Sequence, residues 1–167
     1  MRYYPIFLDL RGRRAVVVGG GKVAERKVRK LLRAGANVQV ISPELTPGLE
    51  RLREQGEMRV TRRQYRQGEL SIGTPRDVPL LVFAATDDPA AQRAIRKAAH
   101  SAGALVNVAD NAAECDFIVP ASFAHGDLHV AISTSGTNPA LARFLRQQLA
   151  AGVRKGKRQR AKVNGQR

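Results

Sequence analysis

The chain has 167 residues, of which 43% are hydrophobic and 26% charged, and 29 Lys and Arg against 14 Asp and Glu give a formal net charge of +15. This length fits one domain with an appendage, and the composition excludes a collagen-like, a disulfide-stapled and a wholly disordered chain. No apolar run approaches the roughly 18 residues of a membrane-spanning helix, so we expect no membrane partner.

Up to residue 112, short runs of β-branched residues alternate with segments of helical periodicity. This rhythm predicts an α/β fold with a Rossmann-like parallel sheet. The predicted strands cover residues 14–19, 37–42, 59–65, 80–85 and 104–109. The predicted helices cover residues 20–35, 46–55 and 88–102, and residues 67–78 are expected to form a loop. Asp87 and Asp88 are best explained as the cap of the third helix.

After residue 112 the pattern changes. Residues 117–123 and 128–133 alternate like the two arms of an antiparallel β-hairpin. A helix is predicted to begin at Pro139 with Asn138 as its cap. Its apolar stripe needs a partner surface. The stripe consists of Leu141, Phe144, Leu145 and Leu149.

The C-terminal segment from Arg154 on holds seven of the 29 Lys and Arg and none of the 14 acidic residues, which leaves +8 on the rest of the chain. Such a run predicts a disordered basic tail, explained either as a solvated terminus or as a contact for nucleic acid. No recognition helix or RNA-binding signature accompanies the charge, so we do not expect nucleic acid as the partner. The +8 body favours an anionic small molecule, with scattered surface charge as the alternative.

Cys115 is the only cysteine, and the N-terminal stretch is too short and too polar for a signal peptide. Both features favour a cytoplasmic protein. Cys115 has no base partner in the sequence and is expected to be a packed thiol. His125 and His129 lack the spacing of a closed metal site, so we expect no resident metal.

Residues 19–24, here called the glycine turn, read Gly-Gly-Gly-Lys-Val-Ala and fit the Gly-x-Gly-x-x-Ala pattern between a strand and a helix. Gly19 permits a tight turn, Gly21 lets backbone amides approach a pyrophosphate, and Ala24 lets the helix pack closely on the strand. The helix N-terminus offers unpaired N–H groups to the anion. The pattern therefore predicts a dinucleotide cofactor.

The end of the second strand departs from the pattern. An acidic residue is expected there to bind the ribose hydroxyls, but the strand ends at Ser42, with Glu44 two residues later. Either side chain could reach a ribose hydroxyl. The choice between NAD and NADP stays open on these residues, although no arginine directly follows the strand.

Polar side chains also follow the fourth and fifth strands. Thr86, Asn107 and Asp110 are expected to point toward the reacting end of the cofactor, because parallel strands present their carboxyl ends to the ligand. Asp110 is the carboxylate best placed for proton transfer. A hydroxyl-rich segment before the last helix suits a substrate carboxylate or phosphate, and an ordinary capping turn explains it equally well. The segment is Ser133, Thr134, Ser135, Gly136, Thr137 and Asn138.

Six ordered segments together resemble the precorrin-2 dehydrogenase family, whose module also forms the N-terminal part of siroheme synthases. They lie between residues 3 and 150. The segments are Tyr4–Leu8, Val18–Lys27, Ala84–Asp88, Asn107–Asp110, Phe117–Ala121 and Ser135–Arg143.

This resemblance implies oxidation of precorrin-2, a polycarboxylate tetrapyrrole, to sirohydrochlorin with NAD as the hydride acceptor, in siroheme biosynthesis. Some members also insert ferrous iron as a substrate, and members pair as homodimers through the hairpin and the following helix. The resemblance implies that Asp110 is the catalytic aspartate, with Lys22 and Val23 on the pyrophosphate side and Pro43 and Glu44 on the adenosine side.

These lines of argument together predict eleven cofactor-binding residues and three segments. The cofactor-binding residues are Gly19, Gly20, Gly21, Lys22, Val23, Ala24, Ser42, Pro43, Glu44, Thr86 and Asn107. The segments are an NAD-binding domain over residues 1–112, a dimerisation and substrate-side hairpin and helix over 113–152, and the basic tail over 153–167. The alternative function is a non-catalytic nucleotide-sensing module, which explains the glycine turn but not residues 107–110.

Overall fold

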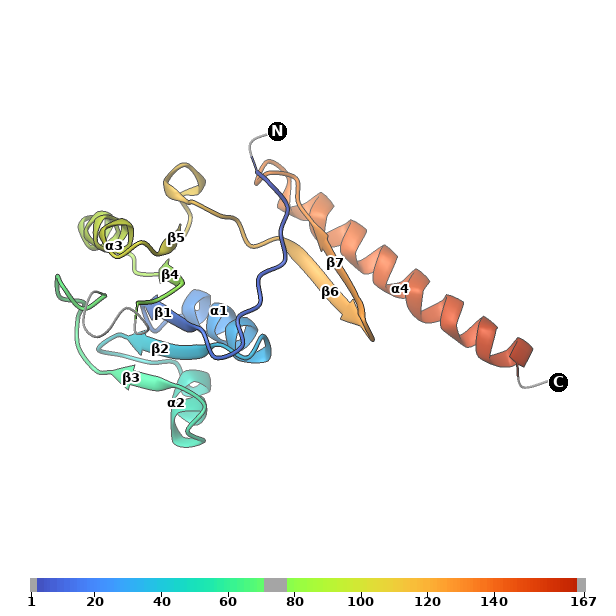
Figure 1. Ribbon diagram of the computed structural model, residues 1–167, viewed down its shortest axis with the longest axis horizontal. Coiled ribbons are helices and arrows are strands. Elements are labelled where there is room, and N and C mark those ends of the chain that lie inside the picture. The colour runs from blue at the N-terminus through green and yellow to red at the C-terminus, as the bar shows by residue number, and fades with distance from the viewer. Residues whose placement is uncertain (1–2, 71–77, 165–167) are drawn as a thin grey trace. The chain divides into compact units, whose positions relative to one another are not determined.

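The computed structural model describes residues 3–70 and 78–164, with side chains up to residue 154 (Figure 1). The chain divides into a larger unit, Pro5–Phe117, and a smaller unit made of residues 1–4 and 118–167. Each unit is described by itself. The sequence pattern predicts a boundary between residues 112 and 113, a few residues earlier in the chain.

A parallel sheet of five strands forms the centre of the larger unit, in the order β3-β2-β1-β4-β5. From β1 the chain moves outward to β2 and β3 and then returns to the other side of β1, so the strand order reverses between β1 and β4. The predicted α/β fold with a Rossmann-like sheet is confirmed. The strands are β1 (Arg14–Val18), β2 (Asn37–Ile41), β3 (Arg59–Thr61), β4 (Leu81–Ala84) and β5 (Leu105–Val108).

Helices cover both faces of this sheet because side chains alternate along each strand. On β1, Val17 faces a buried cluster shared with helices α1 and α2, whereas Val16 faces a second cluster shared with α3. The helices are α1 (Lys22–Arg33), α2 (Pro47–Glu54), α3 (Pro89–Ser101) and the short 3-10 turn η1 (Ala112–Glu114). Part of the predicted loop over 67–78, residues 71–77, lies outside the described residues.

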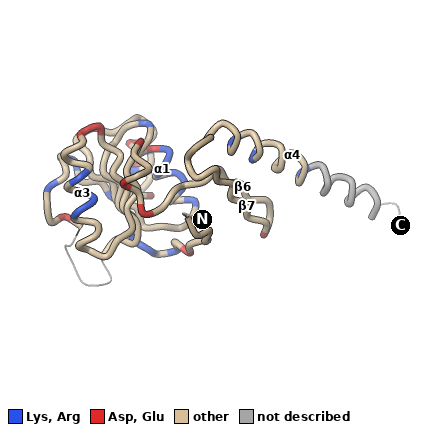
Figure 2. The backbone as a smooth tube through the Cα atoms, turned by 90° about the horizontal axis from the view of Figure 1, so that it is seen from above, with Lys and Arg blue, Asp and Glu red and all other residues tan. Residues whose placement is uncertain are grey.

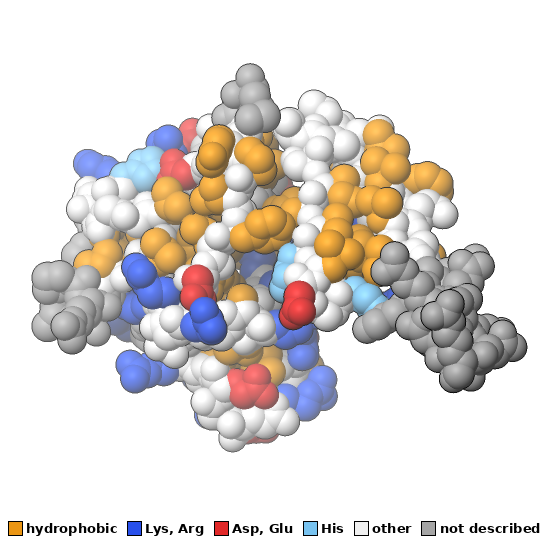
Figure 3. All heavy atoms as spheres, turned by 45° about the vertical axis from the view of Figure 1, so that its right-hand side comes forward, with side chains coloured by type: hydrophobic (Ala, Val, Ile, Leu, Met, Phe, Trp, Pro, Cys, Tyr) orange, Lys and Arg blue, Asp and Glu red, His pale blue; other side chains and the backbone are white. Residues whose placement is uncertain are grey.

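The smaller unit is a hairpin packed against one long helix. Strands β6 (Ala121–His125) and β7 (Leu128–Ile132) pair antiparallel, and both contact α4 (Pro139–Asn164). The predicted cap is confirmed, since the N–H of Leu141 donates a 2.9 Å hydrogen bond to Oδ1 of Asn138. The four residues of the predicted apolar stripe are exposed, and Figure 3 shows hydrophobic side chains gathered at the molecular surface.

The basic segment differs from the prediction of a disordered tail. The backbone of α4 continues past Gly152 and is helical as far as Asn164. Arg, Lys, Gln and Ala dominate this segment, and all four are strong helix formers. Their propensity extends a helix that the apolar stripe alone would end near Leu149. Residues 165–167 lie outside the described part of the chain.

Positive charge in the larger unit is spread over several of its sides rather than gathered in one patch (Figure 2). Among the described ion pairs, Arg62 binds Glu50 and Arg63 binds the buried Glu69. Part of the arginine-rich stretch after β3 therefore neutralises internal carboxylates. No helix in the described part of the chain is both long and apolar enough to span a bilayer.

Candidate active site

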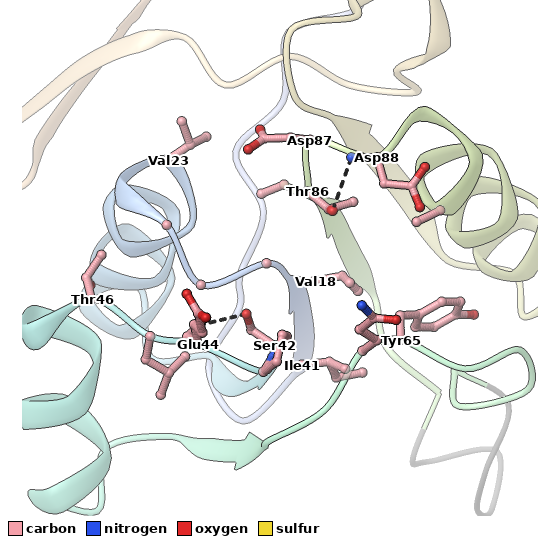
Figure 4. Close-up of a pocket in the computed structure, with 18 of the residues that line it drawn as sticks. Val18, Val23, Ile41, Ser42, Glu44, Thr46, Tyr65, Thr86, Asp87 and Asp88 are labelled. Carbon is pink, nitrogen blue, oxygen red and sulfur yellow. Dashed lines mark hydrogen bonds between the residues drawn. The ribbon is translucent and has the colours of Figure 1, made fainter.

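A cleft of about 770 Å³ opens at the carboxyl ends of β1, β2 and β4, where the strand order reverses (Figure 4). Ligands of open α/β sheets bind at this topological position, and the volume is that of a small-molecule site. The residues that line it belong to four short segments. These are residues 18–23, 41–46, 64–65 and 85–88, with Ala91.

The glycine turn forms the floor of the cleft and is held between its neighbours. The N–H of Gly19 donates to the carbonyl of Ile41 at 2.9 Å, and the carbonyl of Gly20 accepts from the N–H of Thr46 at 3.0 Å. Gly19 has a φ of +122°, and a Cβ there would overlap the backbone of Ala85. The turn therefore needs glycine for both its conformation and its close approach to the chain.

Gly21 differs from Gly19 and Gly20, because a Cβ at position 21 would meet no atom within 4 Å. It is the N-cap of α1 and makes no side-chain capping bond. The first-turn N–H groups of α1 therefore have no side-chain oxygen as a cap. An N-terminus of this kind, beside an open space in front of a glycine, fits the pyrophosphate of a dinucleotide.

The charged groups of the cleft are mostly acidic. Lys22 is the one cation among the described lining residues, against the carboxylates of Glu44, Asp87 and Asp88. The groups of this lining that suit an anion are the backbone N–H groups at the start of α1 and the ammonium of Lys22. The described lining of the cleft contains no arginine.

Ser42 and Glu44, the two predicted ribose-binding residues at the end of β2, have different roles in the structure. Ser42 is 6% exposed, and its hydroxyl donates a 2.7 Å hydrogen bond to the carbonyl of Glu44. Ser42 thereby fixes the turn over residues 42–44. The exposed side chain of Glu44 remains as the carboxylate at this end of the cleft.

Glu25 was missed by the sequence analysis. Its Oε2 accepts a 2.6 Å hydrogen bond from Thr46, and its Oε1 accepts bonds of 2.7 and 2.9 Å from Arg29. The hydrogen bond from Thr46, followed by the bonds from Arg29, lowers the pKa of Glu25 below its ordinary value. The carboxylate joins α1 to the start of α2. Glu25 and Thr46 are 21 residues apart, and no local sequence pattern indicates a contact between them.

The segment after β4 contributes Thr86, Asp87 and Asp88 to the cleft. Asp88 caps α3, since its Oδ1 accepts from the N–H of Ala90 at 2.8 Å, as predicted. Asp87 is not part of this cap. It is exposed and lies with Glu44 on either side of the glycine turn, which corrects the prediction that both aspartates serve the helix (Figure 4).

Asn107 and Ala24 are absent from the described lining of the cleft. Ala24 is fully buried in the core under α1, where it allows the close helix–strand packing that the glycine pattern predicts. Asn107 is 8% exposed. Its Oδ1 accepts a 2.7 Å hydrogen bond from Nζ of Lys27, and its Nδ2 donates a 2.9 Å bond to the carbonyl of Phe117. The structure thus places the side chain of Asn107 in internal hydrogen bonds and not in the described lining of this cleft.

Lys27 is a second residue that the sequence analysis missed. Its Nζ lies 4.8 Å from the ring centroid of Phe83, in cation–π contact. Burial is the largest cause that lowers the pKa of Lys27, and the nearby Arg26 adds to the shift. Its position in the basic face of α1 gives no sign of this burial in the sequence.

Asp110 lies two residues beyond the end of β5 and is exposed. Its backbone has a φ of +59°, a left-handed conformation that aspartate tolerates better than most residues. It lies outside the described lining of the cleft, at the same carboxyl edge of the sheet. An exposed carboxylate in this place is open to a substrate that approaches this edge.

Comparisons with known proteins bear directly on this arrangement. Residues 6–121 match the family described as "Putative NAD(P)-binding". A solved structure of SirC, a precorrin-2 dehydrogenase, matches with a TM-score of 0.74 and 31% identity over 90% of this chain and 71% of that one. The chain belongs to the precorrin-2 dehydrogenase family.

Curated relatives of this precorrin-2 dehydrogenase family member are larger proteins. Siroheme synthase 1 of Serratia proteamaculans (strain 568) is 41% identical over 165 residues, which are 99% of this chain and 33% of the relative. Siroheme synthase of Xylella fastidiosa (strain M12) is 44% identical over 146 residues, 87% of this chain and 30% of the relative. The chain spans about a third of the length of these curated relatives.

The thiol of this precorrin-2 dehydrogenase family member is packed, as expected. The Sγ atom of Cys115 accepts from the N–H of Val108 and donates to its carbonyl, both at 3.2 Å, and burial raises its pKa. This thiol tethers the loop after β5. Among the described residues, no group of three or more His, Cys, Asp and Glu gathers closely enough to hold a metal ion.

The predicted substrate segment, residues 133–138, lies in the smaller unit and bonds largely to itself. The hydroxyl of Thr137 donates to the carbonyl of Thr134 at 2.6 Å, and the N–H of Asn138 donates to the hydroxyl of Thr134 at 3.1 Å. Ser135 has a φ of +55°. These bonds form a capping turn for α4, in which Thr134 is half-buried and the other five residues are exposed.

Proposed function

We propose that this chain oxidises precorrin-2 to sirohydrochlorin with NAD as the acceptor, as a step of siroheme biosynthesis. The observation that carries the proposal is the glycine turn at the switch point of the sheet, with an uncapped α1 N-terminus beside it. Membership of the precorrin-2 dehydrogenase family supports the choice of substrate. A nucleotide sensor would need the same turn, so turnover is the property that separates the two functions.

The residues of the cleft divide the binding of NAD among them. The first turn of α1, with Lys22 and Val23, takes the pyrophosphate, and Pro43 and Glu44 take the adenosine ribose. Thr86 and Asp87 lie farther along the cleft, toward the nicotinamide. When bound, NAD supplies the hydride acceptor.

Asp110 serves as the proton acceptor. Oxidation of precorrin-2 removes one hydride and one proton from the macrocycle, so a base must lie near the carbon framework that loses them. The exposed carboxylate of Asp110 at the carboxyl end of β5 meets this need. The net charge of +8 on residues 1–153 favours the approach of a polycarboxylate substrate.

NAD is the preferred dinucleotide over NADP. The 2′-phosphate of NADP is usually held by an arginine close to the end of the second strand. The described lining carries Glu44 there and no arginine. A carboxylate accepts hydrogen bonds from free ribose hydroxyls and repels a phosphate.

We further propose that two copies pair through the exposed stripe of α4, and that residues 133–138 bind a substrate carboxylate. Four large apolar side chains exposed along one helix are costly unless covered. The stripe is Leu141, Phe144, Leu145 and Leu149. A cytoplasmic location agrees with the free thiol of Cys115.

The test is anaerobic incubation of the purified protein with enzymatically generated precorrin-2 and NAD, followed through the tetrapyrrole spectrum and NADH formation. We expect NAD-dependent conversion and a much slower reaction with NADP. Ferrous iron is then added to ask whether it also accelerates siroheme formation. Intact NAD binding by calorimetry without conversion would instead identify a nucleotide sensor.

A further inference from the structure

The loop over residues 108–117 carries Asp110 and is closed at its base. Asn107, at the end of β5, donates its Nδ2 hydrogen to the carbonyl of Phe117, the last residue of the larger unit, at 2.9 Å. The thiol of Cys115 bonds to the backbone of the same strand end. The backbone of Val106 also exchanges hydrogen bonds of 2.9 and 2.8 Å with Asp116. Asn107 is therefore one of several contacts that join the two ends of the loop carrying Asp110, and the one that reaches Phe117.

Lys27 reaches this closure from a different element. Its Nζ donates a 2.7 Å hydrogen bond to Oδ1 of Asn107, 80 residues away in the chain. An amide oxygen only accepts and an amide nitrogen only donates, so a cation at Oδ1 fixes the nitrogen toward the carbonyl of Phe117. Lys27 thus selects the amide orientation that closes the loop.

Lys27 is half-buried, and its described contacts are an aromatic ring and a neutral amide. Its ammonium lies over the ring of Phe83, which packs edge-on against Phe117 with the ring centroids 5.5 Å apart. Its described hydrogen-bond partner is a neutral amide rather than a carboxylate. Desolvating a cation in such surroundings costs free energy that an apolar side chain of similar length would not.

We propose that Lys27 is a positioning residue, which sets the place of Asp110 through Asn107. Lys27 lies on α1, whose N-terminus forms the pyrophosphate side of the cleft. Its bond therefore connects the helix that holds the cofactor to the loop that carries the proton acceptor. This inference rests on the proposed function, because it assigns Lys27 a task in the same reaction.

The experiment compares Lys27→Met with the wild type and with Arg26→Met, which removes an exposed neighbouring cation of the same helix. For Lys27→Met we expect kcat for precorrin-2 oxidation to fall about tenfold or more, because small displacements of catalytic groups have effects of this size. The KM and Kd for NAD should change less than about twofold, since the cofactor contacts stay in place. Arg26→Met should behave as the wild type.

Amide hydrogen exchange adds a readout that is independent of turnover. Residues 108–116 should exchange faster in Lys27→Met and in Asn107→Leu, and the double variant should be no worse than Asn107→Leu in either kcat or exchange. Additive losses, or an unchanged kcat and exchange in Lys27→Met, would overturn the inference. A wild type that binds NAD but does not oxidise precorrin-2 would refute the proposed function. Unchanged hydrogen exchange of residues 108–116 in Lys27→Met would refute the positioning role of Lys27, whatever the turnover.

Discussion

Thr46 donates a 2.6 Å hydrogen bond to Oε2 of Glu25, although the two residues are 21 positions apart in the chain. Thr46 also caps α2 by accepting from the N–H of Leu49 at 3.2 Å. The connection over residues 42–46 lines the cleft, and this pair clamps its end to α1, which forms the facing wall. Together with the 3.0 Å bond from the N–H of Thr46 to the carbonyl of Gly20, this pair holds the connection against the glycine turn and α1.

Glu25→Gln should lower the free energy of unfolding at neutral pH by about 1–2 kcal/mol, because it weakens hydrogen bonds made to a charged group. The pKa of Glu25 is lower in the folded chain than its ordinary value of 4.5. Its stabilisation is therefore full above pH 4.5 and is lost as the pH falls through the folded-state pKa. Chemical denaturation across a pH series should show the difference from wild type shrinking in acid. Glu54→Gln, at an exposed ion pair, is the control and should change little.

Gly20→Ala and Gly21→Ala should separate folding from cofactor binding. A Cβ on Gly20 would overlap the carbonyl of Glu44, so we expect a loss of about 1–3 kcal/mol in stability. A Cβ on Gly21 meets only open space, so that variant should lose only the smaller amount of stability that alanine costs at an N-cap. Its methyl group would occupy the approach of the pyrophosphate and weaken NAD binding at least about tenfold. Wild-type NAD affinity in Gly21→Ala by calorimetry would exclude the proposed pyrophosphate position.

Asp87→Ala and Asp88→Ala should affect different properties, NAD affinity in the first variant and stability in the second. Loss of the Asp88 cap should cost about 1 kcal/mol of stability. Asp87→Ala should leave the melting temperature unchanged and weaken NAD binding, because its carboxylate lies in the cleft and outside the cap. Thermal melts paired with NAD titrations distinguish the two. Equal loss of stability in both variants would show that Asp87 also caps α3 and would contradict this assignment.

Glu44→Arg should shift the cofactor preference toward NADP. The substitution removes the carboxylate that repels a 2′-phosphate and places a cation near the end of β2, where such phosphates are bound. The ratio of Kd values for NADP and NAD should fall at least about tenfold relative to wild type. Glu57→Arg is the control, because it makes the same change in charge at an exposed position outside this cleft. An identical ratio in both variants would remove Glu44 from the adenosine site.

The sheet and the glycine turn could be predicted because their signals are local. β-branched runs mark buried strands, and Asp88 and Asn138 stand directly before the helices that they cap. The continuation of α4 to Asn164 does not follow from the sequence pattern, because a dense run of like charges predicts disorder while the same lysines and arginines are good helix formers.

The side-chain contacts around Asn107 could not be predicted in the same way. The register pairs Asn107 with Phe83, and Phe83 belongs to the cluster under α1. Side chains of paired residues share a face of the sheet, so Asn107 faces α1 rather than the cleft. Its partner Lys27 is brought to it only by the packing of α1 across the sheet, a contact that no spacing along the chain reveals.

The most direct measurement is the yield of sirohydrochlorin and NADH from precorrin-2 under anaerobic conditions at saturating NAD, for the wild type and for Asp110→Asn. The wild type should form the two products in equal amounts. Asp110→Asn should bind NAD with unchanged affinity and lose most turnover, since the amide cannot accept the proton. Undiminished turnover in Asp110→Asn, or a wild type that binds NAD and forms neither product, would contradict a dehydrogenase that relies on this carboxylate.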